Sequence, residues 1–179
     1  SNSKGSAIQI MANNVLINST FTNNTNLVGS GGAIRIYGSN NVVIDSTFIN
    51  NTADGGGAIS IDTSKNVVID SIFMNNTAIL GGAIYSEGVA DNSMANLTGN
   101  TAKSGGAIGS SSSVIIEYCT FTDNTAQSEN GGAIYIHNKG NVNNCNFTGN
   151  TAQTGKGGAI YLYNNGDINN CNFTNNTAY

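Results

Sequence analysis

Two short phrases recur along the whole chain at a nearly constant spacing, and this repeat constrains the fold more than any other feature. The first phrase is "GGAI", whose alanines stand 24 to 26 residues apart: Ala7 in a degenerate first copy, then Ala33, Ala58, Ala83, Ala107, Ala133 and Ala159. The second phrase reads as "FTNNTA" or a close variant and begins at Phe21, Phe48, Phe73, Leu97, Phe121, Phe147 and Phe173. Repeats of about 20 to 50 residues are typical of solenoids, so the spacing predicts seven stacked units.

Each unit predicts β-strands, because its apolar residues alternate and no segment shows helical spacing. In "VVIDSTF" the alternating set that we expect on one face is Val42, Ile44, Ser46 and Phe48. The same pattern recurs in "VVIDSIF", residues 67–73. In the "GGAI" strand of residues 133–136 we expect Ile134 and Ile136 to point inward and Tyr135 to point outward. Gly, Ser, Asn and Asp between the strands predict tight turns.

Equivalent positions carry the same residue type from unit to unit, which favours a parallel β-helix over an array of hairpins. One such column is asparagine without exception: Asn24, Asn51, Asn76, Asn100, Asn124, Asn150 and Asn176. Another column holds small residues: Ser19, Ser46, Ser71, Ala95, Cys119, Cys145 and Cys171. We therefore predict an all-β parallel β-helix (β-solenoid) of about seven coils of roughly 25 residues, forming a single domain over residues 1–179.

The asparagine and cysteine columns both have structural explanations. A side-chain amide has two donors and one acceptor atom, so a stacked Asn bonds both the turn backbone and its counterpart in the next coil. The alternative, functional explanation for the many asparagines is N-linked glycosylation. The asparagines that stand at acceptor positions of glycosylation sequons are Asn50, Asn75, Asn146, Asn172 and Asn175. The cysteines stand among serines and alanine, so we expect buried free thiols rather than a disulfide.

Composition narrows the classes of partner. Only 9% of the residues are charged and the formal net charge is −4, which disfavours nucleic acid and anionic membrane surfaces. No apolar run is long enough to span a membrane, so we expect membrane attachment only through an anchor outside these residues. The sequence stops where the next "GGAI" would begin, and we expect a fragment of a longer repeat protein.

The alternation of "GGAI" with "FxxN" resembles the repeats of chlamydial polymorphic outer-membrane proteins. The Asn-rich form, "FTNNTA" followed by "GGAIY", is similar to adhesin-like surface proteins of methanogenic archaea. The resemblance covers essentially all 179 residues. It implies a right-handed parallel β-helix displayed on a cell surface for attachment, but it does not identify a ligand. We expect an extracellular location, with a surface protein or glycan of another cell as the partner. In the fourth coil "DNSMANL" replaces the apolar strand, and we expect irregular structure there.

Two alternatives to attachment belong to other functional classes. A polysaccharide-active β-helix enzyme, lyase or hydrolase, needs clustered carboxylates. The stacked pair here is Asp45 and Asp70, which we expect to be solvated outward strand positions, and His137 is the only histidine. We therefore predict no catalytic residue, no metal site and no cofactor. An ice-binding solenoid needs a flat threonine array, and the array here is interrupted by Ile49, Ile72, Met74 and Asn96.

The outward positions of the "GGAI" strands are the predicted recognition surface. The residues that we expect to contact a ligand are Tyr85, Tyr135, His137, Tyr161 and Tyr163. Exposed rings with a polar tip suit sugar stacking or protein contact, although tyrosine also favours strand surfaces for stability alone. The longest links, "QSEN" and "QTGK", come directly before the last two of these strands. We expect Tyr135, Tyr161, His137 and Tyr163 to form a two-by-two platform.

Overall fold

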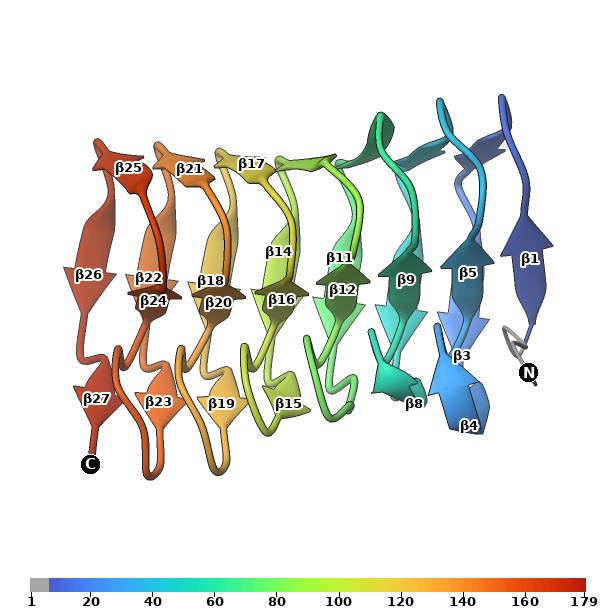
Figure 1. Ribbon diagram of the computed structural model, residues 1–179. Coiled ribbons are helices and arrows are strands. Elements are labelled where there is room, and N and C mark those ends of the chain that lie inside the picture. Colours follow the sequence, from blue (N-terminus) through green and yellow to red (C-terminus); the bar gives the residue numbers. More distant parts are fainter. Residues whose placement is uncertain (1–6) are drawn as a thin grey trace.

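The computed structural model describes residues 7–179, and these form seven coils stacked along one axis (Figure 1). All of the regular elements among the described residues are β-strands. None of the described segments is a helix long and apolar enough to cross a membrane. In Figure 1 the chain runs up the near face and down the far face while it advances from right to left, so the coil is right-handed. The predicted fold class is confirmed.

Three sheets run the length of the stack, and each takes one strand from every coil. The first sheet consists of β1 (Ile8–Ile10), β5 (Ile34–Ile36), β9 (Ile59–Ile61), β12 (Ile84–Ser86), β16 (Ile108–Ser110), β20 (Ile134–Ile136) and β24 (Ile160–Leu162). The second consists of β2 (Val15–Ile17), β6 (Val42–Ile44), β10 (Asn66–Ile69), β13 (Ala90–Ser93), β17 (Val114–Glu117), β21 (Gly140–Asn143) and β25 (Gly166–Asn169). The third consists of β3 (Thr20–Thr22), β7 (Thr47–Ile49), β11 (Ile72–Met74), β14 (Asn96–Thr98), β18 (Thr120–Thr122), β22 (Asn146–Thr148) and β26 (Asn172–Thr174).

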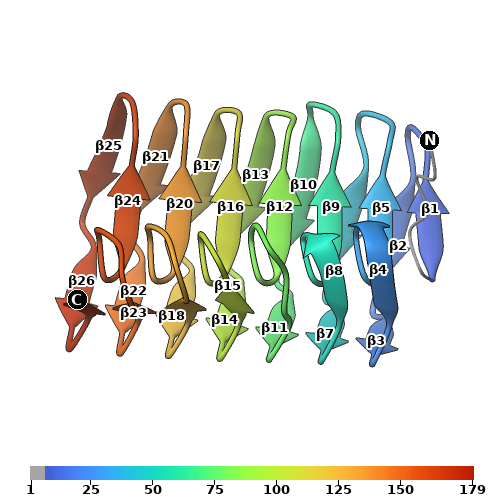
Figure 2. The same cartoon turned by 60° about the horizontal axis from the view of Figure 1, so that its bottom comes forward.

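A fourth group of strands lines the corner between the third sheet and the first, which Figure 2 brings forward. They are β4 (Thr25–Ser30), paired with β8 (Thr52–Gly55), and a separate set of β15 (Thr101–Ala102), β19 (Thr125–Ala126), β23 (Thr151–Ala152) and β27 (Thr177–Ala178). Isolated bridges of Thr77 to Thr52 and Thr101 connect the two sets. Every coil therefore turns this corner at the same place.

All strand pairs are parallel, and all are in register except for a shift between Asn26 and Ser30 in the β4–β8 pair, so the predicted columns exist in space. Phe121 pairs with Phe147, and Thr125 pairs with Thr151. Hydrogen-bonded asparagine partners lie 24 to 27 residues apart along the chain. Changes in coil length fall in the connections and leave the columns aligned.

The alternation expected across "VVIDSTF" is wrong at its first half. Val43 is fully buried, whereas Val42 and Ile44 are only half-buried and face outward. Asp45 adopts a left-handed conformation with φ of 51°, which turns the chain between the second and third sheets. The alternation is interrupted there, so Ser46 and Phe48 share the interior with Val43. The equivalent turn at Asp70, with φ of 49°, changes the pattern of residues 67–73 in the same way.

The interior consists of stacked rows of side chains, in which most neighbours are of similar type. Phe48 and Phe73 stack with ring centroids 4.8 Å apart, and Phe121 and Phe147 with centroids 4.7 Å apart. Ile134 and Ile136 are fully buried, as predicted. Offset ring pairs at such distances contribute stability beyond the apolar area that they bury, about 0.5–1.5 kcal/mol each.

The predicted asparagine column is a hydrogen-bonded ladder in the interior. Asn51, Asn76, Asn100, Asn124 and Asn150 are all fully buried. The side-chain Nδ2 of Asn100 donates to the carbonyl oxygen of Phe73 at 3.1 Å and to Oδ1 of Asn124 at 3.0 Å. Both donors and the acceptor atom of each buried amide are therefore satisfied, which is what permits burial of so polar a row.

The cysteines are free thiols in the small-residue column, as predicted. Cys119 and Cys145 are buried and Cys171 is half-buried. Their sulfur atoms take the place of the serine hydroxyls in this column. Oγ of Ser46 donates to the carbonyl of Ile44 at 2.9 Å, and Sγ of Cys145 donates to that of Asn143 at 3.2 Å.

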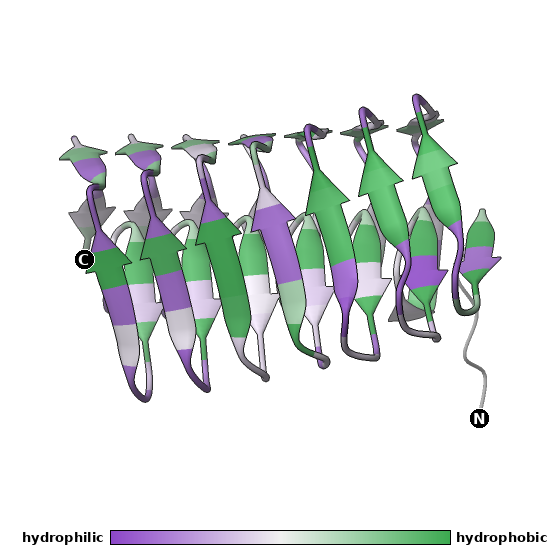
Figure 3. Ribbon diagram, turned by 90° about the horizontal axis from the view of Figure 1, so that it is seen from above, coloured by the Kyte–Doolittle hydropathy of each residue, from purple (hydrophilic) through white to green (hydrophobic). Residues whose placement is uncertain are grey.

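The expected irregularity of the fourth coil is wrong, because β13 pairs in register with β10 and β17 on either side. The unusual sequence instead places a polar side chain in the interior. Asn92 is fully buried between Val68 and Ile116, and neither its Oδ1 nor its Nδ2 has a hydrogen-bond partner. Figure 3, which looks onto the second sheet, shows β2 and β6 apolar along their length, β10 apolar after a hydrophilic start, and β13 mostly hydrophilic.

Candidate functional site

The first sheet orients its side chains through the glycine pair that begins each strand. Gly131 has φ of 73°, a conformation that glycine adopts without strain. A Cβ on Gly132 would collide with the carbonyl oxygen of Gly158 in the next coil. The pair therefore lets the chain turn tightly against its neighbour. Ala133 and Ile134 then enter the core, and Tyr135 faces outward.

Two outward columns result on this sheet. The column that contains Tyr135 reads Arg35, Ser60, Tyr85, Gly109, Tyr135 and Tyr161 from β5 to β24. The second column consists of the residues that directly follow these strands: Tyr37, Asp62, Glu87, Ser111, His137 and Tyr163. His137 and Tyr163 are exposed and Tyr85, Tyr135 and Tyr161 are half-buried, whereas Ser60 and Gly109 are buried.

Four of the five predicted ligand-contacting residues form the expected two-by-two platform. Tyr135 and Tyr161 stack with ring centroids 5.8 Å apart and an angle of 4° between the planes. His137 and Tyr163 stack at 4.6 Å and 10°. Oη of Tyr135 lies 3.3 Å from Nδ1 of His137, so a hydrogen bond joins the two stacks. The side chain of Tyr163 is 59% exposed, so the platform is open to a ligand.

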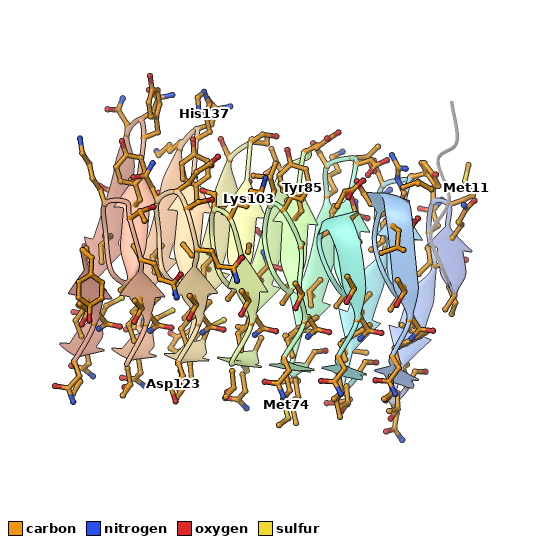
Figure 4. The ribbon with its side chains drawn as sticks, turned by 90° about the horizontal axis from the view of Figure 1, so that it is seen from below. Met11, Met74, Tyr85, Lys103, Asp123 and His137 are labelled. Atoms are coloured by element: carbon orange, nitrogen blue, oxygen red, sulfur yellow. The ribbon has the colours of Figure 1, made fainter. Side chains whose placement is uncertain are left out.

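The fifth predicted residue, Tyr85, lies on the same sheet but two coils from Tyr135. Figure 4 shows Tyr85 and His137 on one side of the molecule, with Met74 and Asp123 on the opposite edge. Gly109 occupies the position between Tyr85 and Tyr135 in the column. A cavity of about 350 Å³ opens there, lined by both tyrosines together with His137 and Glu129.

The pKa of Tyr135 is raised from its ordinary value. The largest cause is partial burial of its hydroxyl, and the neighbouring Tyr161 and Glu129 disfavour a further negative charge. Tyr135 is therefore neutral at physiological pH and can both donate and accept a hydrogen bond.

Sequence reasoning missed an ion pair at the other end of the same face. Nη2 of Arg35 lies 2.8 Å from Oδ2 of Asp62, one coil further along, and its Nε donates to the same oxygen at 2.9 Å. The guanidinium also lies 4.7 Å from the ring centroid of Tyr37. The signal was present in the two columns, because Arg35 and Asp62 occupy adjacent outward positions of neighbouring coils. The face is thus charged at β5 and β9 and aromatic at β20 and β24.

The two long corner links lie against each other beside the platform. The backbone N–H of Lys156 donates to Oδ1 of Asn130 at 2.8 Å, and a Cβ on Gly155 would meet the carbonyl of Glu129. The first link, residues 127–130, contributes Glu129 to the cavity beside Tyr135. The longer links and the rings therefore form one continuous surface.

Asp45 and Asp70, which we expected to be outward strand positions, are exposed corner residues instead. Their left-handed conformations explain why short polar residues are favoured there. Among residues 7–179 no group of three or more His, Cys, Asp or Glu side chains is arranged to hold a metal ion.

The sequon asparagines are separate from the buried ladder. Asn50, Asn75, Asn146, Asn172 and Asn175 are all exposed. Their side chains are therefore accessible, whereas the ladder asparagines that follow Asn50, Asn75 and Asn175 carry the structural hydrogen bonds. Glycosylation at these positions stays a prediction.

The geometry defines a β-solenoid repeat protein with an aromatic row along one sheet. Four segments match the family model of the Chlamydia polymorphic membrane protein repeat: residues 45–62, 70–87, 118–137 and 144–163. Together they cover less than half of the 179 residues. Comparison with curated proteins and with solved structures gives no match. The predicted resemblance to the chlamydial repeats is confirmed for these segments, and the likeness to archaeal adhesin-like proteins stays a prediction.

Proposed function

We propose that this chain is part of an adhesin-like protein, displayed on a cell surface, that attaches to a surface protein or glycan of another cell. The observation that carries the proposal is the platform formed by Tyr135, Tyr161, His137 and Tyr163. The matched repeat is that of chlamydial polymorphic membrane proteins, and its name supports a location at an outer membrane or cell surface.

The platform has the features of a contact surface rather than of a packing element. Rigid aromatic side chains give a large contact area at a small cost in conformational entropy. Their hydroxyl and imidazole groups stay available to a polar partner. The interior rows already stabilise the coils, so these exposed rings are free to serve recognition.

The test is to remove the Tyr135 and Tyr161 rings together and to measure attachment to candidate cells and to a glycan array. We expect the double variant Tyr135→Ala/Tyr161→Ala to lose at least about tenfold in attachment, because aromatic residues dominate contact energy at interfaces. Its Tm should fall by only a few degrees, because both side chains lie half-buried on the outer face and not in the core, where truncation destabilises most.

The matched control removes an exposed tyrosine elsewhere. Tyr118 is 59% exposed and stands at a left-handed corner where later coils have Asn144 and Asn170. Tyr118→Asn should leave attachment unchanged. Full attachment by the double variant would show that the platform is only a stabilising surface ladder.

A further inference from the structure

The outward column of the first sheet that contains Tyr85, Tyr135 and Tyr161 is interrupted by one glycine. Tyr135 and Tyr161 occupy adjacent coils and stack directly, whereas Tyr85 and Tyr135 are separated by the coil that carries Gly109. Neighbouring strands lie about 4.8 Å apart, so the two tyrosine positions are about 10 Å apart. Gly109 itself is buried, and a Cβ there would lie 2.8 Å from the backbone nitrogen of Gly81 and 3.4 Å from Cδ2 of Tyr85. The open space therefore lies farther out, between the side chains of Tyr85 and Tyr135, which both line it.

The same coil also has a small side chain in the neighbouring outward column. There the exposed Ser111 stands between Glu87 and His137. The cavity of about 350 Å³ is also lined by Leu80 and Glu129. This volume is at the lower end of the range for small-molecule sites, about 300–1,000 Å³. It suits a single ring rather than an extended ligand.

The lining favours a sugar ring over an aromatic side chain of a partner protein. Ser111, His137 and Glu129, which carry hydroxyl, imidazole and carboxylate groups, are among the residues that line the cavity. A purely aromatic guest would remove water from these groups without replacing its hydrogen bonds, which is costly. A pyranose presents C–H groups on its two faces and hydroxyls around its edge, so it matches both the tyrosine walls and these polar groups. The carboxylate of Glu129 disfavours an anionic sugar.

We propose that the slot between Tyr85 and Tyr135 binds one neutral pyranose ring, with its faces against the two tyrosines and its hydroxyls at Ser111, His137 and Glu129. This rests on the proposed attachment function and names the class of ligand for it. The platform then extends the same surface toward the next residues of a glycan chain.

The test uses methyl pyranosides of gluco, galacto, manno and N-acetylgluco configuration, each at millimolar concentration, with saturation-transfer NMR on the folded chain. N-Acetyltyrosine amide is the aromatic comparison. We expect saturation transfer to the ring C–H protons of at least one pyranoside. Tyr85→Ala should weaken that binding by roughly three- to tenfold, which is the range for loss of one aromatic contact. Tyr85→Phe, which keeps the ring, should retain most of the binding, and Tyr118→Asn should leave it unchanged.

Three outcomes overturn the slot: no pyranoside binds, binding is the same in Tyr85→Ala, or only the aromatic compound binds. Attachment of the same variants to cells is measured in parallel. Loss of attachment on removing Tyr135 and Tyr161, without pyranoside binding, would retain the proposed function and reject the slot. Pyranoside binding that depends on Tyr85, with unchanged attachment in every variant, would retain the slot and reject the attachment surface.

Discussion

The side-chain Nδ2 of Asn76 donates to Oδ1 of Asn100 at 3.0 Å, and both residues are fully buried in successive coils. The backbone N–H of Asn76 donates to the same oxygen at 2.9 Å. Each asparagine thus joins its own turn to the next one, and the row transmits register along the stack.

Removing one asparagine should therefore destabilise the chain strongly. Asn100→Ala leaves the carbonyl of Phe73 and the amide groups of Asn76 without their partners. We expect a loss of roughly 3–5 kcal/mol in the free energy of unfolding, measured by urea denaturation, because buried orphaned polar groups cost about 1–3 kcal/mol each. The control is Asn146→Thr at an exposed position where the preceding coil has Thr120. Equal stability of the two variants would refute the ladder as a source of stability.

Replacing the buried Asn92 should stabilise the chain, in contrast to replacing an asparagine of the ladder. Its buried amide has no hydrogen-bond partner, and its neighbours in the column are Val68 and Ile116. Asn92→Val should stabilise the chain by about 1–3 kcal/mol, because it removes the unmet desolvation cost and restores the apolar column. The reverse change, Val68→Asn, should lower Tm. A lower Tm for Asn92→Val would contradict the assignment of Asn92 as an unsatisfied core residue.

Asp91 makes the stability depend on pH. Partial burial on the outer face of β13 raises its pKa, and the nearby Glu117 carboxylate raises it further. The folded chain then binds this proton more tightly than the unfolded chain. The associated stability is present below the ordinary carboxyl pKa of about 4 and is lost as the pH rises through the raised value. Asp91→Asn should flatten the pH dependence of Tm in this window. Asp167→Asn, an exposed residue in the same column, is the control and should leave this part of the profile unchanged.

The thiol column predicts which substitutions of cysteine are tolerated. The backbone N–H of Cys119 donates to Sγ of Cys145 at 3.4 Å, and Ser71 accepts the same bond from Ser46 earlier in the column. Cys145→Ser should change the free energy of unfolding by less than about 1 kcal/mol. The serine hydroxyl can still accept from the N–H of Cys119 and donate to the carbonyl of Asn143. Cys145→Ala should cost more, about 1–3 kcal/mol, because it leaves the N–H of Cys119 without a partner. Equal costs would show that sulfur acts here only by filling space.

The repeat made the columns predictable, because a fixed period aligns equivalent residues whatever the local geometry. The asparagine ladder, the phenylalanine stack and the outward tyrosines therefore follow from the sequence. The burial of Val43 did not, because alternation stops at the left-handed residue Asp45 and one sequence cannot show where such a turn falls. The slot beside Tyr85 could not be predicted from the sequence either. Gly109 alone indicates only a residue with low strand propensity, and the structure is needed to show which rings flank it.

Differences in coil length fall in the connections, and each of the three long sheets takes one parallel strand from every coil along the whole stack. A coil is consequently an interchangeable genetic unit. Duplication or deletion of one repeat by recombination would move the aromatic platform relative to the Arg35 ion pair by one layer of about 4.8 Å without creating a mispaired strand. The surface pattern of such a protein can thus evolve in whole steps along the axis, while the interior is copied unchanged.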